Sequence, residues 1–328
     1  MIRNIALYGA KIAFLMKKRD KMEDIKNNIL ETIGNTPLVK INALNTNGFA
    51  EVVAKVEFFN PGGSVKDRVG ISMINAAEKA NILKAGATII EPTSGNTGVG
   101  LAIAAAVKGY QLILTMPDTM SVERQKLLAA YGAQIVLTNG NDGMAGAIKK
   151  AQELKDSIPG SFMPLQFSNP ANPASHVATA QEIIDSCAGK IDVLVAGVGT
   201  GGTLGGIAQA FKDLKVDCEI VAVEPDTSAV LSGKEPGPHL LQGIGAGFIP
   251  EVLDTKLIDK VVPVSAQDAG NTARLAAQKE GLLIGISGGA ALYAALQLSK
   301  DKVYSSKRIV VILPDTGERY LSTWLFDK

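Results

Sequence analysis

The chain has 328 residues, of which 46% are apolar and 20% are charged. This length and composition predict a large buried core divided between two domains. The 33 basic and 32 acidic residues give a net charge of +1, so no basic field indicates binding to nucleic acid or a membrane surface, and a small molecule is the expected partner.

Cysteine and histidine are both scarce in this chain. Cys187 and Cys218 show no paired spacing, which argues against a disulfide framework and favours reduced thiols packed inside a cytoplasmic protein. His176 and His239 are the two histidines, too few for a metal cluster or a histidine-based triad. We therefore expect no metal and look for chemistry that does not depend on imidazole.

Residues 1–26 are predicted to form a disordered N-terminal extension. The first 21 residues carry six basic side chains, and Lys11 interrupts the apolar stretch, so a secretory signal is poorly supported. A targeting or surface-binding tail is the alternative interpretation. Elsewhere no run of about eighteen apolar residues occurs, so no membrane-spanning segment is expected.

From residue 27 onward, short β-branched runs alternate with amphipathic segments, a pattern that predicts an α/β fold with mostly parallel sheets covered by helices on both faces. Strands are predicted at 37–41, 51–58, 88–92, 112–116, 135–138, 193–198, 220–224, 261–264 and 308–313. Their apolar character predicts burial on both sides. Helices are predicted at 64–81, 96–108, 121–131, 143–157, 176–186, 204–214, 266–279 and 289–298.

The stretch 60–68, NPGGSVKDR, joins a predicted strand to a predicted helix and places Lys66 on the first helical turn. Taken alone, Lys66 would be an ordinary solvated lysine, because most lysines are. Asp67 and Arg68 are predicted to form an ion pair in this turn.

A second turn, PTSGNTG at 92–98, also joins a strand to a helix. Its backbone amides and the side chains of Thr93, Ser94, Asn96 and Thr97 would suit a carboxylate. Capping of the helix by Ser94 or Asn96 is the competing explanation.

Two irregular stretches follow. Residues 168–173 contain two Asn-Pro pairs, which disfavour helix and predict a domain crossing. We expect a larger domain of residues 27–58 and 170–328 and a smaller, mobile substrate-binding domain of residues 59–169. The stretch 232–250 is too long for a simple connection and is expected to line a site.

The turn GTGGT, Gly199 to Thr203, lies between an apolar strand and a helix. Backbone amides of Gly199, Gly201 and Gly202, together with the hydroxyls of Thr200 and Thr203, could converge on an anion at the helix N-terminus. The glycine spacing fits neither a P-loop nor a dinucleotide fold, so a single phosphate is the candidate. A tight turn whose glycines serve packing alone is the alternative.

A third turn, GISGGA at 285–290, precedes the last long helix, where Ser287 could cap that helix or hydrogen-bond a ring nitrogen. In α/β folds such turns are expected to meet at the carboxyl ends of the strands. Together with Lys66, they suggest a cofactor with one phosphate, an aldehyde and a pyridine ring. Pyridoxal 5'-phosphate has all three, and its aldehyde condenses with a lysine amine.

Six motifs carry a family resemblance: NPGGSVKDR, EPTSGNTG, GVGTGGT, GPHLLQGIGAGFIP, GISGGAA and GERYLST. Their order and sequence resemble O-acetylserine sulfhydrylase, the cysteine synthase family of fold-type II pyridoxal-phosphate enzymes, over about residues 27 to 326. The resemblance implies a two-domain fold like that of the tryptophan synthase β subunit.

The resemblance also implies roles for individual residues. Lys66 corresponds to the Schiff-base lysine, and Gly199, Thr200, Gly201, Gly202 and Thr203 correspond to the phosphate-binding turn. Asn96 matches the residue beside the cofactor's 3-hydroxyl, and Ser287 matches the partner of the pyridine nitrogen. Thr93, Ser94, Asn96, Thr97 and Gln166 fall on the substrate-binding site.

The implied reaction is a β-replacement that converts O-acetyl-L-serine and sulfide to L-cysteine and acetate through an aminoacrylate, with Lys66 as the general base. A neutral Ser287 beside the ring nitrogen favours elimination and replacement over transamination. A homodimer is implied by the same resemblance.

Three alternatives stay open. The donor could be O-phosphoserine, although the loop 242–248 offers no basic residue for a phosphate, or the thiol could be homocysteine, as in cystathionine β-synthase. The protein could also carry an added regulatory binding role. Residues 172–183 depart from the Thr-Thr-Gly-Pro-Glu-Ile run common in the bacterial family, which bears on docking of the usual partner, serine acetyltransferase.

Overall fold

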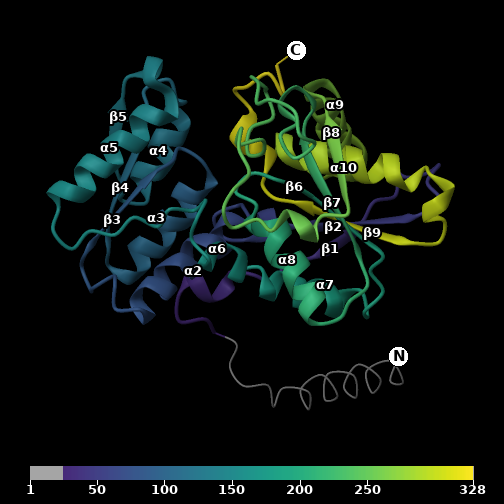
Figure 1. Cartoon of the computed structure of the whole chain (residues 1–328), viewed down its shortest axis with the longest axis horizontal. Coiled ribbons are helices and arrows are strands. Elements are labelled where there is room, and N and C mark those ends of the chain that lie inside the picture. Colours follow the sequence, from purple (N-terminus) through teal and green to yellow (C-terminus); the bar gives the residue numbers. More distant parts are fainter. Residues whose placement is uncertain (1–24, 328) are drawn as a thin grey trace, which may run out of the picture.

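The computed structural model describes residues 25–327, so most of the expected N-terminal extension lies outside the described residues. The described part contains two β-sheets, which lie side by side with helices packed around each (Figure 1). The helices and strands agree with the α/β fold expected from the alternation of patterns in the sequence.

The smaller sheet has three parallel strands in the order β3-β4-β5. These strands are β3 (Thr88–Pro92), β4 (Gln111–Pro117) and β5 (Gln134–Thr138), and the associated helices are α2 (Lys66–Lys79), α3 (Asn96–Lys108), α4 (Val122–Ala130) and α5 (Gly143–Ser157). Side chains alternate along β4: Leu112 and Leu114 pack toward α2 and α3, whereas Ile113 packs with Ala151 of α5. This sheet therefore has an apolar layer on each face.

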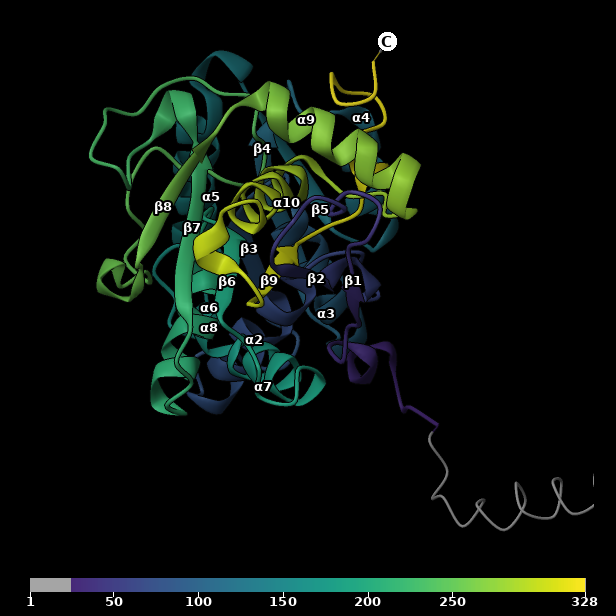
Figure 2. The same cartoon turned by 90° about the vertical axis from the view of Figure 1, so that its right-hand side faces the viewer.

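The larger sheet has six strands in the order β1-β2-β9-β6-β7-β8, and β1 alone runs antiparallel to its neighbour. Its strands are β1 (Leu38–Lys40), β2 (Glu51–Val56), β6 (Val193–Gly197), β7 (Glu219–Pro225), β8 (Lys260–Val264) and β9 (Arg308–Leu313). The helices α9 (Ala266–Leu275) and α10 (Ile286–Ser299) cover one face, and α7 (Val177–Ser186) and α8 (Gly202–Asp213) cover the other (Figures 1 and 2).

The period-two pattern of the central strands explains this arrangement. Val193 and Val195 of β6 pack in the core beneath α10, whereas Leu194 and Ala196 pack with α8. The prediction of burial on both sides is wrong for β5 and β8, which keep exposed residues such as Leu137 and Lys260. Both are edge strands, where one flank has no neighbouring strand and helix cover is incomplete.

The Asn-Pro stretch contains a short helix, α6 (Ala171–Ala174), where the sequence predicted none. Pro170 precedes the helix with a φ of −64°, and Pro173 lies in its first turn. Proline is tolerated there because the first-turn N–H groups have no intrahelical acceptor to lose.

Several other boundaries differ from the prediction, and the helix predicted at 289–298 is α10, Ile286–Ser299, which includes Ser287. The strand β2 ends at Val56, and residues Glu57–Phe59 form a 3₁₀ turn. The helix α9 ends at Leu275, and the chain then forms a π-helical turn over Ala276–Glu280.

Candidate active site

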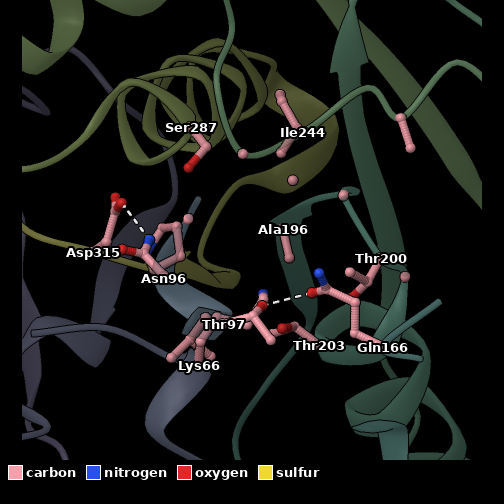
Figure 3. A pocket seen from close by; sticks show the side chains of 18 of the residues that line it. Lys66, Asn96, Thr97, Gln166, Ala196, Thr200, Thr203, Ile244, Ser287 and Asp315 are labelled. Carbon is pink, nitrogen blue, oxygen red and sulfur yellow. Dashed lines mark hydrogen bonds between the residues drawn. The ribbon is translucent and has the colours of Figure 1, made fainter. Parts of the chain in front are cut away.

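The three polar turns and Lys66 meet around one cavity of about 270 Å³ between the two sheets. The cavity is lined by these predicted site residues: Lys66, Thr93, Asn96, Thr97, Gln166, Gly199, Thr200, Gly201, Thr203 and Ser287. Figure 3 shows the side chains of several of them, among them Asn96, Thr97 and Ser287, around a common space. Ser94 and Gly202 are the two predicted site residues that do not line it.

Lys66 is the first residue of α2, and the loop before it is anchored to the segment after β9. The Val65 N–H donates to the Pro314 carbonyl at 2.8 Å, and Ser64 pairs with Asp315 in an antiparallel bridge. Burial lowers the pKa of the Lys66 amine, while the charges of Asp315 and Glu57 act in the opposite direction. This environment favours a neutral, nucleophilic amine more than bulk water would.

The position of Lys66 also depends on a close crossing of α2 and α3. A Cβ at Gly100 would lie 2.3 Å from the Lys66 carbonyl oxygen, and a Cβ at Gly70 would lie 2.4 Å from the Gly100 carbonyl carbon. Only glycine permits this approach, because any larger residue would push the two backbones apart.

The expected ion pair between Asp67 and Arg68 is wrong. Arg68 contacts Glu57 at 2.8 Å and Glu182 at 2.7 Å. Asp67 instead accepts from the Gly62 N–H, and burial raises its pKa to about 7. The guanidinium on the first turn of α2 therefore faces away from its sequence neighbour because two other carboxylates lie within its reach.

The glycine-rich turn 199–203 leads from β6 into α8 and forms a backbone cradle. Gly201 precedes the helix with a φ of +79°, a conformation that glycine adopts without strain. A Cβ at Gly199 would lie 2.3 Å from the Gly243 carbonyl oxygen, so this residue also needs to be glycine. A helix N-terminus approached by Gly-rich backbone, with two threonine hydroxyls beside it, is a suitable site for one phosphate group.

Two buried residues to which the sequence assigned no role in the site hold this cradle from behind. Asn172 donates through Nδ2 to Thr200 Oγ1 at 3.0 Å, and His176 Nε2 lies 3.2 Å from Thr203 Oγ1. Burial lowers the pKa of His176 well below its usual value, so the ring is neutral. Asn172 lies in the short helix α6 and His176 precedes α7, so no local pattern indicated which turn they would support.

The turn after β3 contributes Thr97 and Asn96. Thr97 Oγ1 donates to Gln166 Oε1 at 2.5 Å, so the start of α3 contacts the segment 164–167. Ser94 instead donates to Met120 Sδ at 2.9 Å. Neither Ser94 nor Asn96 caps α3: its N-cap is Gly95, without a side-chain cap.

Ser287 likewise does not cap its helix. It is the second residue of α10, whose N-cap is Gly285 without a side-chain cap. Its side chain is buried within the protein and its hydroxyl points into the cavity (Figure 3). The turn follows a single bridge between Ile284 and Thr316 rather than a regular strand.

The sequence also missed Asp315, a buried residue directly after β9 that lines the cavity. Its Oδ2 accepts hydrogen bonds from Asn96 Nδ2 at 2.7 Å and from the Tyr320 hydroxyl at 2.6 Å. Burial raises the pKa of Asp315 above its usual value. Its position after an apolar strand was a signal, but its distance of more than two hundred residues from Asn96 hid the contact.

The long stretch 232–250 lines the cavity as expected, through Gly243, Ile244 and Ala246. His239 supports this loop by a contact of 2.8 Å between its Nε2 and the Gly245 carbonyl. Within residues 25–327, no cluster of three His, Cys, Asp or Glu side chains could hold a metal ion. In the same part of the chain, no helix is long and apolar enough to cross a membrane.

These residues fit pyridoxal phosphate on the evidence of their chemistry. A glycine cradle at a helix N-terminus accepts a phosphate, a desolvated lysine amine can condense with an aldehyde, and a serine hydroxyl lies in the same cavity for a ring nitrogen. Glycine at residue 199 is required by close packing against the backbone of Gly243, which also lines the cavity.

The chain belongs to the family of pyridoxal-phosphate dependent enzymes, whose family model matches residues 29–315. It is 52% identical to a cysteine synthase of Staphylococcus aureus over 302 residues, which cover 92% of this chain and 97% of that protein. The resemblance seen in the sequence motifs is thereby confirmed, as are the fold class and the cofactor.

Solved structures extend this likeness. A cysteine synthase (OASS) from Entamoeba histolytica has a TM-score of 0.91 at 45% identity and covers 93% of both chains. An O-ureido-L-serine synthase has a TM-score of 0.89 at 44% identity, covering 92% of this chain and 96% of the other. The same fold therefore occurs with more than one product.

Proposed function

We propose that this protein is a cysteine synthase that replaces the acetate of O-acetyl-L-serine with sulfide to yield L-cysteine. The observation that carries the proposal is the cavity in which Lys66, the glycine cradle and the Thr97–Gln166 pair face one another. The 52% identity to a cysteine synthase over most of the chain supports the same activity.

Pyridoxal phosphate, when bound, supplies an aldehyde for an amine and a ring that withdraws electrons from the substrate carbon. The cradle Gly199–Thr203 would bind its phosphate, Asn96 would face its 3-hydroxyl and Ser287 its ring nitrogen. Lys66 would hold the cofactor covalently at rest. Once displaced, its Nζ would remove the substrate Cα proton and later return it, a role that its burial-lowered pKa favours.

The amino-acid substrate would bind through its carboxylate. Thr93, Thr97 and Gln166 line the cavity and offer hydroxyl and amide groups for this purpose. We include Ser94 and Asn96 in the substrate site, and Ser94 would join it by giving up its contact with Met120 Sδ.

One observation favours a second candidate donor, O-phosphoserine. The sequence offered no basic residue in the loop 242–248, but Arg124 of α4 reaches that loop and donates through Nη2 to Gln242 Oε1 at 2.8 Å. The loop itself has no basic residue, as the sequence indicated, and Arg124 lies outside the residues that line the cavity. A guanidinium at this position could attract a phosphorylated substrate.

A panel of donor substrates distinguishes O-acetylserine from O-phosphoserine as the donor. Purified enzyme is assayed with O-acetylserine, O-phosphoserine and serine, each with sulfide or homocysteine, and the products are identified by mass spectrometry. We expect the highest kcat/KM with O-acetylserine and sulfide. A preference for O-phosphoserine that Arg124→Ala abolishes would instead establish the second candidate.

Lys66→Ala tests the central role of the lysine. We expect loss of the visible absorption band of lysine-bound cofactor and loss of multiple turnover. Lys79→Ala, at the exposed far end of the same helix, is the matched control and should retain both. A Lys66→Ala variant with normal multiple turnover would refute the assignment.

We further propose a homodimer in the cytoplasm, with a larger domain of residues 27–58 and 170–328 and a smaller, mobile domain of residues 59–169. Serine acetyltransferase is the proposed protein partner, and a regulatory role would act through it. Light scattering of the purified protein tests the dimer, and co-elution with serine acetyltransferase tests the partnership.

A further inference from the structure

We propose that Asp315 is a positioning residue of the cofactor site, which orients the Asn96 amide so that one N–H remains directed at the cofactor. The inference rests on the proposed function only for the role of Asn96 beside the cofactor's 3-hydroxyl. No motif in the sequence pointed to Asp315.

The backbone of Asp315 joins two of the turns that form the site. It forms an antiparallel bridge with Ser64, just before Lys66, and its carbonyl accepts from the Gly285 N–H at 3.1 Å, just before Ser287. Its side chain reaches the third turn through Asn96. Asp315 therefore contacts the lysine, asparagine and serine turns at once.

The hydrogen bonds around Asp315 have a defined direction. Oδ2 accepts from both Asn96 Nδ2 and the Tyr320 hydroxyl, because an ionised carboxylate has no proton to donate. Burial raises the pKa of Tyr320 well above its usual value, so its hydroxyl keeps the proton that it donates. The Asn96 amide must consequently present its NH₂ group, and not its oxygen, to Asp315.

This direction is compatible with either charge of Asp315. Oδ1 is buried without a hydrogen-bond partner, and a Cβ at Gly285 would lie 2.1 Å from it. A proton taken up by the carboxyl group can reside on Oδ1 and leave Oδ2 as the acceptor. Ionised Asp315 thus fixes the Asn96 amide, and Asp315 protonated on Oδ1 keeps the same orientation.

The consequence for the cofactor follows from the amide's geometry. With one Nδ2 hydrogen held by Asp315, the second is available to an oxygen on the cofactor ring. Without Asp315 the amide could rotate and present its oxygen to the cofactor oxygen, which is repulsive. Loss of this orientation would weaken cofactor retention and alter the electronic environment of the ring.

The experiment uses reconstituted holoenzyme and compares Asp315→Ala, Asp315→Asn and Tyr320→Phe. Its readouts are the visible absorption spectrum and the rate of pyridoxal phosphate release. We expect Asp315→Ala to release cofactor about tenfold faster and to change the visible band. Asp315→Asn keeps an acceptor oxygen and should stay within about twofold of wild type, and Tyr320→Phe, which leaves the Asn96 contact intact, should do the same.

A double-mutant comparison separates positioning from general stability. If Asp315 acts through Asn96, Asp315→Ala should add little to the release rate of Asn96→Ala. Additive effects, or an Asp315→Asn variant as defective as Asp315→Ala, would overturn the proposal. If Asp315→Ala does not fold, Asp315→Asn and Asn96→Ala decide it: near-wild-type release in the first and fast release in the second are expected.

The result is independent of which reaction the enzyme catalyses. A wild-type protein that binds pyridoxal phosphate but makes no cysteine would refute the proposed function and leave this test in place. Wild-type spectrum and release in folded Asp315→Ala would refute the role of Asp315 and leave cysteine synthesis in place.

Discussion

Glu91 shows how a single buried residue can support the site from outside it. It lies on β3, and its carboxylate accepts from the backbone N–H groups of Leu165 at 3.0 Å and Gln166 at 3.3 Å. Leu165 has a φ of +56°, which is unusual for a leucine. Glu91 thus holds a strained turn whose next residue, Gln166, lines the cavity.

Glu91 should make the stability of the protein depend on pH. Burial raises its pKa from 4.5 to about 7, so the folded protein binds a proton that the unfolded chain releases. The contribution of Glu91 to the free energy of unfolding is therefore full below pH 4.5. It falls by about 3 kcal/mol as the pH rises through 7. Urea unfolding at pH 5 and pH 8 measures the change.

Glu91→Gln is the variant for this prediction, and exposed Glu153→Gln is its control. The amide cannot titrate and offers one acceptor for two N–H groups, so we expect it to be less stable than wild type at pH 5. That deficit should shrink by about 3 kcal/mol at pH 8. A deficit that stays constant with pH would contradict the prediction.

The contact between Thr97 and Gln166 leads to a second prediction at this scale. Thr97→Val removes the hydroxyl but keeps the shape, and it leaves Gln166 Oε1 without its buried donor. We expect KM for the amino-acid substrate to rise about tenfold. Thr97→Ser keeps the hydroxyl and should stay close to wild type, and an equal loss in both variants would show that the methyl group matters instead.

At the scale of elements, the crossing of α2 and α3 positions the lysine. The two glycines at the crossing, Gly70 and Gly100, allow each backbone to reach the other. Glycine within a helix usually lowers helix stability. The sequence of each helix alone did not indicate which other helix its glycine would contact. The close approach offsets that propensity and brings the start of α2 against the start of α3.

Gly100→Ala should therefore destabilise the protein by about 2 kcal/mol despite alanine's better helix propensity. Because the added Cβ meets the Lys66 carbonyl, turnover should fall even where the protein remains folded. Thermal unfolding and steady-state kinetics measure the two effects. Gly288→Ala in α10 is the control, because its Cβ would meet only ordinary contacts at 3.4 Å and beyond.

At the scale of the whole molecule, a buried ionic cluster joins elements distant in sequence. Arg68 of α2 contacts Glu57, after β2, and Glu182 of α7, and Lys55 of β2 contacts the same Glu182 at 2.5 Å. Although burial opposes it, hydrogen bonds from Arg68 and Lys55 lower the pKa of Glu182 to about 2. The cluster connects the helix carrying Lys66 to the large sheet and its outer helix.

Arg68→Ala should destabilise the protein by about 3–5 kcal/mol, because it leaves two carboxylates buried without their main partner. Chemical unfolding measures the loss. Lys150→Ala, which removes an exposed ion pair with Glu153, should change stability by less than about 1 kcal/mol. Adding Glu182→Gln to Arg68→Ala should recover part of the loss, and no recovery would argue that packing, not charge, is responsible.

The order of the elements and the turns that form the site could be predicted from the sequence, because both depend on local signals. Alternating apolar runs and glycine-rich turns indicated β3, β9, α5 and the turn 199–203 at or near their observed positions. The burial of the edge strands, the presence of α6 and the end of α9 differed from the prediction, because packing against neighbouring elements determines them.

The local chemistry of the site was determined by the chain itself: a lysine after Pro-Gly-Gly, a glycine cradle and a serine in the first turn of the last long helix. Only the tertiary structure decided which distant groups complete it. Asp315 reaches Asn96, Arg124 reaches the loop 242–248, and Glu91 holds Gln166, each across a separation that carries no local pattern. The reason is physical: motifs report the backbone conformation of a few consecutive residues, whereas hydrogen bonds and burial depend on which surfaces the folded chain brings together.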